Sequence, residues 1–181
     1  RVERLKTNIA FRSEYMFPQS KSYFTLELKP KLDQYYIVEI TNDPFGRYTR
    51  TETTQTPGIT TTTESYDDKF KFSVEFVKRW GNLAFRMGLI ESKGGLGADA
   101  YVWDDRIKFS VDAWNFNSKE PQNENAHLKA TAAWQVNNIL FLNAGYDNFL
   151  NKDRAAGFVG AGLRFSDDDI KYLLGSVPIP K

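Results

Sequence analysis

Apolar and polar residues alternate one by one along most of this chain. The strictest stretch reads Phe70-Lys71-Phe72-Ser73-Val74-Glu75-Phe76, with every even position apolar. A repeat of two residues is the period of a β-strand whose two faces meet different surroundings. Helical spacing is nearly absent before the last residues. The sequence therefore predicts an all-β fold made of two-faced strands.

The alternation predicts about ten antiparallel strands. They cover residues 4–17, 22–30, 35–48, 66–80, 83–91, 96–103, 106–116, 127–136, 139–147 and 157–165. An even number of strands returns both chain ends to the same rim of an up-and-down barrel, and closure removes the exposed strand edges that promote aggregation. We expect one domain, an antiparallel up-and-down β-barrel over residues 1–165, followed by a short helical tail over 166–181.

The predicted connections alternate in length. Short ones such as Gly81-Asn82, Asp104-Asp105 and Asn137-Asn138 carry the residue types of tight hairpin turns, and all fall at the rim that holds the termini. Longer polar ones, residues 117–126 and 148–156, fall at the opposite rim. Transmembrane barrels have their short turns on the periplasmic side. This pattern predicts a barrel of the outer-membrane type in a bacterial outer membrane, with both termini on the periplasmic side.

The segment 47–66 is rich in threonine and has Pro57-Gly58 near its middle. Threonine favours strands and Pro-Gly marks a turn, so the segment is predicted to be a hairpin that protrudes beyond the rim. A solvated loop is the alternative interpretation.

Strand parity separates the charged residues from the apolar ones. The apolar face contains Phe70, Phe72, Val74, Phe76 and Phe109, which we predict to face lipid. Parity by itself does not say which face points outward. An apolar face can fill the interior of a soluble lipocalin-like carrier of a small ligand or lipid, or it can lie against a bilayer.

The positions of aromatic residues favour the bilayer. Tyr36, Trp80, Trp134 and Phe165 lie on the apolar face near the rim with the short turns. Tyr and Trp prefer the membrane–water interface, where an apolar ring meets a wet polar tip, so these residues are predicted to form a girdle. Tyr15, Phe17 and Tyr146 are predicted to form the opposite girdle. The charged face then lines a narrow lumen that pairs of opposite charge would close.

Several function classes are not supported by the sequence. The formal net charge is +1 with scattered Lys and Arg, which predicts no nucleic-acid partner, and the chain has no Cys for a thiolate metal site. His127 is the single histidine, and no nucleophile or orienting group stands beside it in a recognisable pattern. We expect His127 to be solvated, and we predict no enzyme, no catalytic residue, no cofactor and no metal. An outer-membrane barrel enzyme acting on lipid or peptide stays as an alternative.

The last strand, Gly157-Phe158-Val159-Gly160-Ala161-Gly162-Leu163-Arg164-Phe165, resembles the closing strand of bacterial outer-membrane proteins. In that strand, a Gly is followed by alternating apolar residues that end on an aromatic. The tail after it begins with Ser166 as a helix N-cap and the acidic run Asp167-Asp168-Asp169, and Gly175 is a stop signal.

Four segments together resemble the C-terminal region of MlaD-like proteins of the MCE family. They are Thr51 to Thr63, Phe76 to Trp80, Gly88 to Gly97 and Val159 to Leu174. The resemblance implies a barrel that belongs to a longer chain with an MCE domain and a helical stalk, and inner-membrane ABC transporter components as partners. It further implies an outer-membrane module of a phospholipid transport system, which anchors the periplasm-spanning protein and contacts outer-membrane lipid. Assembly into a homo-oligomer is compatible with this role.

Overall fold

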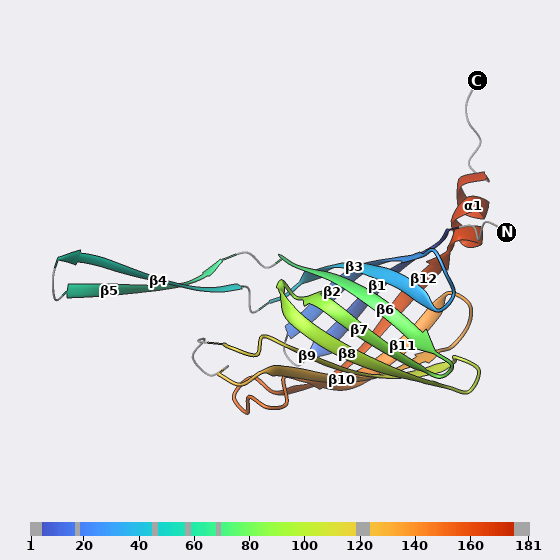
Figure 1. Ribbon diagram of the computed structural model, residues 1–181. Helices are drawn as coiled ribbons and strands as arrows, with labels where there is room; N and C mark the ends of the chain where they lie inside the picture. The colour runs from blue at the N-terminus through green and yellow to red at the C-terminus, as the bar shows by residue number, and fades with distance from the viewer. Residues whose placement is uncertain are drawn as a thin grey trace, which may run out of the picture.

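The computed structural model describes residues 5–16, 19–44, 47–56, 59–67, 70–118 and 124–175. Within these residues, ten antiparallel strands close into a barrel and two more form a separate hairpin (Figure 1). The barrel strands are β1 (Lys6–Met16), β2 (Gln19–Lys29), β3 (Gln34–Asn42), β6 (Phe70–Trp80), β7 (Leu83–Ile90), β8 (Lys93–Val102), β9 (Ile107–Trp114), β10 (His127–Gln135), β11 (Leu140–Asp147) and β12 (Ala156–Ser166). The predicted all-β antiparallel barrel is confirmed.

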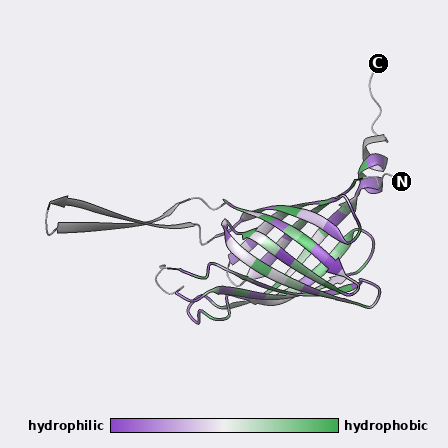
Figure 2. Cartoon of the chain, in the orientation of Figure 1, coloured by the Kyte–Doolittle hydropathy of each residue, from purple (hydrophilic) through white to green (hydrophobic). Residues whose placement is uncertain are grey.

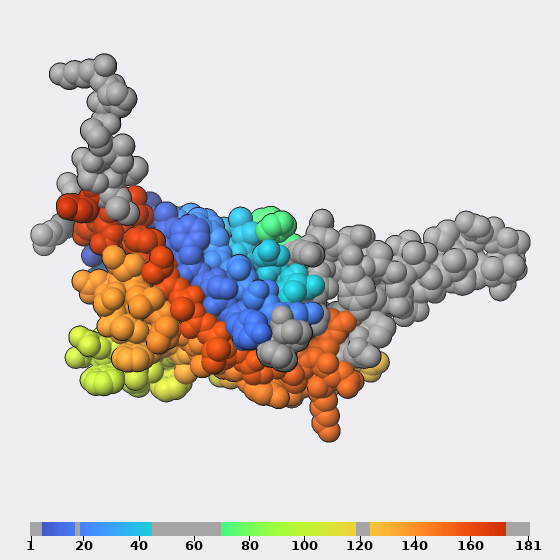
Figure 3. All heavy atoms as spheres, turned by 180° about the vertical axis from the view of Figure 1, so that it is seen from behind, coloured from blue at the N-terminus to red at the C-terminus, as the bar shows by residue number. Residues whose placement is uncertain are grey.

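The barrel closes where its first and last strands pair. β1 and β12 run antiparallel from the pair Asn8 and Ser166 to the pair Tyr15 and Val159. Seen from behind, the blue N-terminal strands and the red C-terminal strand lie side by side on one continuous wall (Figure 3). Each barrel strand pairs with its neighbours in the chain, except that β3 pairs with β6 across the inserted hairpin.

The two rims of the barrel differ. The rim that we call the turn rim holds both chain ends and the connections 30–33, 81–82, 103–106 and 136–139 (Figure 1). Two of these connections are longer than predicted, because β8 ends at Val102 and β10 at Gln135. Trp103, Asp104 and Asp105 all have positive φ, of 55°, 52° and 63°. Three successive residues with positive φ cannot continue the pairing of a strand, so the turn has four residues, 103–106, instead of the two predicted.

The opposite rim, which we call the loop rim, also differs from the prediction. The connection between β7 and β8 is a tight turn of Glu91 and Ser92, with φ of 46° and 67°. Two successive residues with positive φ match the twist of the flanking strands, so β8 begins at Lys93 and includes the Gly94–Gly97 segment. The predicted strand began later, at residue 96, and left Gly94 and Gly95 in the connection.

Two elements extend from the barrel. β4 (Arg47–Thr56) and β5 (Ile59–Asp67) pair with each other and project from the loop rim (Figure 1). At the turn rim, α1 (Asp167–Gly175) follows β12 directly. Its first turn is closed by a capping box, in which the backbone N–H and Oγ of Ser166 donate to Oδ2 of Asp169 at 2.8 and 2.6 Å. The predicted residues 176–181 of the tail lie outside the described residues.

Hydropathy alternates along every barrel strand, which gives the wall a banded pattern in Figure 2. No helix in the described part of the chain has the length and apolar character needed to cross a membrane.

Candidate functional site

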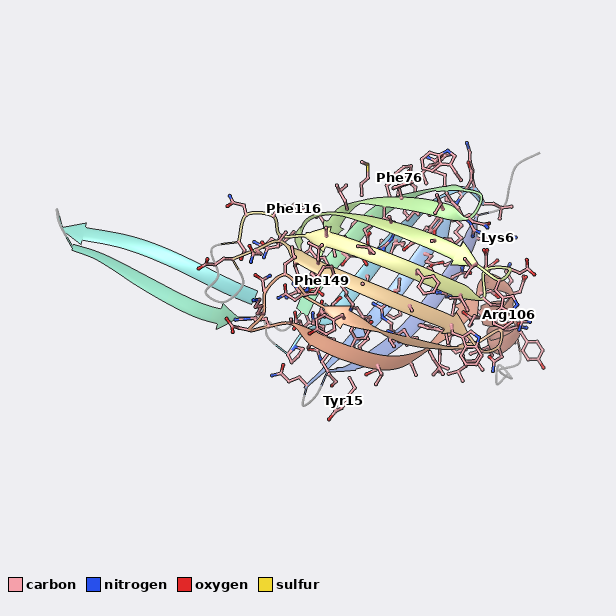
Figure 4. All side chains as sticks on the ribbon, turned by 90° about the horizontal axis from the view of Figure 1, so that it is seen from below. Lys6, Tyr15, Phe76, Arg106, Phe116 and Phe149 are labelled. Carbon is pink, nitrogen blue, oxygen red and sulfur yellow. The ribbon has the colours of Figure 1, made fainter. Side chains whose placement is uncertain are left out.

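The outer wall of the barrel is apolar. On β6, Phe70, Phe72 and Val74 expose 59%, 56% and 49% of their surface, and Phe109 on β9 exposes 50%. Phe76, which Figure 4 labels on the outside, is half-buried because its ring lies 5.6 Å from that of Tyr36. More exposed apolar side chains continue around the wall: Phe11, Phe24, Ile40, Phe85, Leu89, Leu96, Val111, Leu142, Val159 and Leu163. An apolar surface this continuous marks a protein that contacts apolar surroundings.

Aromatic side chains gather at both ends of this wall. At the turn rim, Tyr36, Trp80 and Trp134 are exposed and Phe165 is half-buried, which places the predicted girdle residues on the outer surface. Trp103, in the β8–β9 turn, joins them there. Sequence reasoning missed Trp103 because it was taken as the last residue of the predicted strand 96–103, whereas it lies in the turn, where strand parity does not apply. At the loop rim, Tyr15, Phe116 and Phe149 are exposed (Figure 4), and so is Tyr146. Phe17, predicted to belong to that second group, lies outside the described residues.

The barrel interior is polar and holds ion-pair clusters. Glu14 on β1 is fully buried at the centre of the first cluster. Its carboxylate accepts a hydrogen bond from Nζ of Lys129 and one of 2.9 Å from Nδ2 of Asn143, and Nε of Arg12 lies 3.2 Å away. The Arg12 guanidinium stacks on the Tyr23 ring at 4.0 Å. Lys129, Arg12 and Glu14 were all assigned to the charged face by parity, and that face is the interior.

A second cluster surrounds Arg86 on β7. Its guanidinium contacts carboxylate oxygens of Glu75 at 3.1 Å, Asp99 at 3.0 Å and Asp112 at 2.5 Å. Gly97 on β8 makes room for this arrangement, since an added Cβ would lie 2.9 Å from Cζ of Arg86 and 2.5 Å from Oδ1 of Asp112. An inward-facing glycine in a strand is the sequence signal for such a close approach.

A third cluster, the loop-rim cluster, closes the interior near the loop rim. Its members are Lys21, Asp43, Lys71, Glu91, His127 and Asp147. Lys21 on β2 is 1% exposed, and its Nζ lies 3.2 Å from Glu91, 3.1 Å from Asp147 and 3.4 Å from Asp43. Lys71 on β6 contacts Asp43 and lies 3.1 Å from the other oxygen of Glu91.

Sequence reasoning missed most of this cluster. Lys21 stands just before the predicted start of its strand at residue 22, and Asp43 and Glu91 lie beyond the ends of β3 and β7. The signal was present, because Lys21 has the same parity as the inward residues Glu27 and Lys29. Extending the predicted strand by one residue would have found it.

His127 belongs to the loop-rim cluster and is buried, so the expectation that it is solvated was wrong. Its Nε2 lies 2.6 Å from Oδ1 of Asp147, and its ring stacks on Trp114 with centroids 4.0 Å apart. It was expected to begin the strand 127–136, and β10 does begin at His127, but its side chain is buried in the interior. Serine hydrolases need a nucleophile hydrogen-bonded to the base. Here Nε2 is engaged by the Asp147 carboxylate, which also contacts Lys21.

Ion pairs and hydrogen bonds also lie at the turn rim, beside the opening of the barrel. Lys29 lies 2.9 Å from Glu27, and the hydroxyls of Tyr35 and Tyr101 are 3.3 Å apart. In the β8–β9 turn, the carboxylate of Asp105 accepts two hydrogen bonds of 2.6 and 2.8 Å from the Arg79 guanidinium. These bonds lower the pKa of Asp105. An ion pair of 2.5 Å joins Lys78 to Asp33 and lowers the pKa of the Asp33 carboxyl.

Two internal cavities remain between these clusters. The first measures about 110 Å³ and is lined by charged groups such as Arg12, Glu39 and Lys129. The second measures about 140 Å³ and opens toward the turn rim. Glu27, Lys108 and Arg164 line both cavities. Each cavity can hold several water molecules, which hydrogen-bond to such polar walls.

The fold and these surfaces define a class of protein: a closed ten-stranded antiparallel barrel with an apolar outer wall and a charge-paired interior. The chain belongs to a family of lipocalin-like domains, which matches residues 7–172. It is 33% identical to an uncharacterized protein of Aquifex aeolicus (strain VF5). The alignment has 187 residues and covers 99% of this chain and 56% of that relative. The chain thus spans about half the length of this relative. No solved structure matches it.

The resemblance to MlaD-like proteins of the MCE family was therefore wrong, since the matching family is that of lipocalin-like domains. The role that it implied, an outer-membrane module of MCE-type phospholipid transport, is withdrawn with it, and so are the MCE domain, the stalk and the ABC transporter partners. The segments that suggested the resemblance have structural explanations: Gly97 makes room for an ion pair, and Ser166 caps a helix. The lipocalin-like alternative agrees with the comparisons.

Proposed function

We propose that this lipocalin-like barrel is inserted in a lipid bilayer, and that its location is a bacterial outer membrane with both chain ends on the periplasmic side. The observation that supports insertion is the inverted polarity of the barrel. Phe72 and Val74 are exposed on the wall, whereas Glu14 and Lys21 are buried inside. A barrel in water buries its apolar side chains, and a barrel in lipid exposes them.

The height of the apolar wall is consistent with a membrane. Barrel strands have from 8 residues in β9 to 11 residues in β6. At about 3.3 Å per residue and a tilt of about 40°, they rise about 20 to 28 Å, which is close to the apolar band of about 25 Å in outer-membrane barrels. The aromatic side chains Tyr36 and Trp80 at one rim and Tyr15 at the other would lie at the two interfaces.

A soluble carrier of an apolar ligand is the second candidate, and the description of the family as lipocalin-like favours it. Carrier pockets usually measure about 300 to 1,000 Å³ and are mostly apolar. The two internal cavities of this barrel measure about 110 and 140 Å³, and charged groups such as Arg12 and Glu39 are among the residues that line the first. An apolar ligand there would desolvate these charges, which is unfavourable. We propose no catalytic role for His127.

Reconstitution tests the proposal. The chain is refolded in the presence of phosphatidylcholine vesicles, which are then floated on a density gradient before and after washing at alkaline pH. We expect the chain to float with the vesicles after the wash and to migrate faster on a detergent gel when unheated, as folded barrels do. A chain that folds in buffer without detergent, stays at the bottom of the gradient and binds a fluorescent fatty acid in a one-to-one ratio would replace the membrane barrel by the carrier.

A further inference from the structure

Two neighbouring cavities extend from the turn rim toward the loop-rim cluster. The larger one is lined at the turn rim by Leu32, Asp105 and Arg106. The smaller one shares part of that lining and reaches Ile90, Glu91 and Trp114 near the loop rim. Water can enter the larger cavity from the turn rim, and the smaller cavity lies beneath the loop-rim cluster.

The loop-rim cluster stands across the end of this space. Its side chains come from β2, β6, β10, β11, the residue after β3 and the β7–β8 turn, so they converge from most of the circumference. The Nζ atom of Lys21 contacts three carboxylates that come from three different places in the chain. No other side chain of the cluster is described with contacts to all three. Lys21 therefore holds the carboxylates together.

We infer that the polar interior is a pathway for small cations and that Lys21 is the group that closes it. This inference rests on the proposed insertion in a bilayer, because a pathway has meaning only across a membrane. With Lys21 in place, its ammonium offsets part of the negative charge of Glu91, Asp147 and Asp43 and blocks the opening. Without it, the three carboxylates keep Lys71, which contacts Asp43 and Glu91, and His127, which contacts Asp147. Their mutual repulsion separates them, water fills the gap, and the remaining negative charge attracts cations and repels anions.

Removing one partner from a buried ion-pair network is strongly destabilising for that network, since the remaining charges are left uncompensated. Local opening of the loop-rim cluster relieves this cost by admitting water, and it leaves the backbone pairing of the barrel intact. The native chain and a Lys21 variant therefore differ in the arrangement of the loop-rim cluster, which is closed in the native chain and open in the variant, and share the rest of the barrel.

The test measures ion leak through vesicles that contain the refolded chain. We compare the native chain with Lys21→Met, Glu91→Gln and the charge-conserving Lys21→Arg. Lys78→Met is the matched control, because Lys78 is an ion-paired lysine at the opposite rim that lines neither cavity. Flotation and gel migration show for each variant whether it is inserted and folded.

We expect Lys21→Met to raise the potassium leak about tenfold or more, and Glu91→Gln to raise it less, because it removes one of the charges that Lys21 holds. Lys21→Arg and Lys78→Met should leak like the native chain. In a KCl gradient, the reversal potential of Lys21→Met should show preference for K⁺ over Cl⁻. If Lys21→Met does not fold, the comparison of Glu91→Gln with Lys21→Arg decides. Folded, inserted variants that all leak like the native chain, or an anion preference, would overturn the inference. A native chain that fails to insert would overturn the proposed function instead.

Discussion

A substitution that places a lysine in the middle of the outer wall distinguishes a membrane barrel from a soluble one most sharply, because the cost of the lysine differs between lipid and water. Val74 stands next to the centre of β6, exposes 49% of its surface and pairs with Val38 and Leu89 on the neighbouring strands. One residue along a tilted strand corresponds to about 2.5 Å of height, so Val74 lies close to the midplane of the proposed bilayer. In lipid, a lysine at this depth costs about 2 to 4 kcal/mol. In water, an exposed surface substitution changes stability by about 0.5 kcal/mol or less.

The matched control for Val74→Lys is Leu83→Lys. Leu83 is 52% exposed on the same wall, but it is the first residue of β7 at the turn rim, where the cost of a lysine falls to about 0 to 1 kcal/mol. The assay is reversible urea unfolding of each variant in phosphatidylcholine vesicles. We expect Val74→Lys to lower the free energy of unfolding by at least about 1 kcal/mol more than Leu83→Lys. Equal and small effects at both positions would refute the argument that the wall faces lipid.

Three more predictions concern the interior and the tail. Gly97→Ala should lower the free energy of unfolding by about 1 to 3 kcal/mol because its methyl group meets the ion-pair cluster, whereas Gly94→Ala, with nothing within 4 Å, should be close to neutral in the same urea titration. His127→Ala should destabilise the barrel by about 1 to 3 kcal/mol, because a buried carboxylate loses a hydrogen-bond partner, and the inserted variant should keep its circular dichroism spectrum. Ser166→Ala should shorten or melt α1, seen as lost helical signal, at a cost of about 1 kcal/mol. Hydrogen bonds from Ser166 lower the pKa of Asp169, so the native cap is complete above the ordinary pKa of an aspartate and is lost as the pH falls through the lowered value. Acid should therefore reduce the helical signal of the native chain more than that of the variant, which keeps only the backbone hydrogen bond to Asp169.

The alternation of residues by itself determined the architecture. A period of two over segments such as 70–76 leaves no helical alternative, and the even number of segments placed both termini at one rim. The same parity identified Glu14, Arg86 and Lys129 as members of one face, because every strand is subject to the same geometric rule. The capped helix after Ser166 was also readable, since an N-cap and its acidic first turn are local signals.

The tertiary structure decided what parity leaves open. Inverting a barrel preserves its alternation, so parity did not choose the outer face; the positions of the aromatic residues predicted Phe72 outside, and the closed structure exposes Phe72 and buries Glu14. Likewise, only the structure brought Lys21, Glu91 and Asp147 together. Glu91 and Asp147 are 70 and 126 residues from Lys21 along the chain, and the three meet through barrel closure. The burial of His127 against Trp114 has the same origin. Local sequence specifies the strand and its two faces, whereas strand closure sets which side of the wall each face meets and which charges become neighbours.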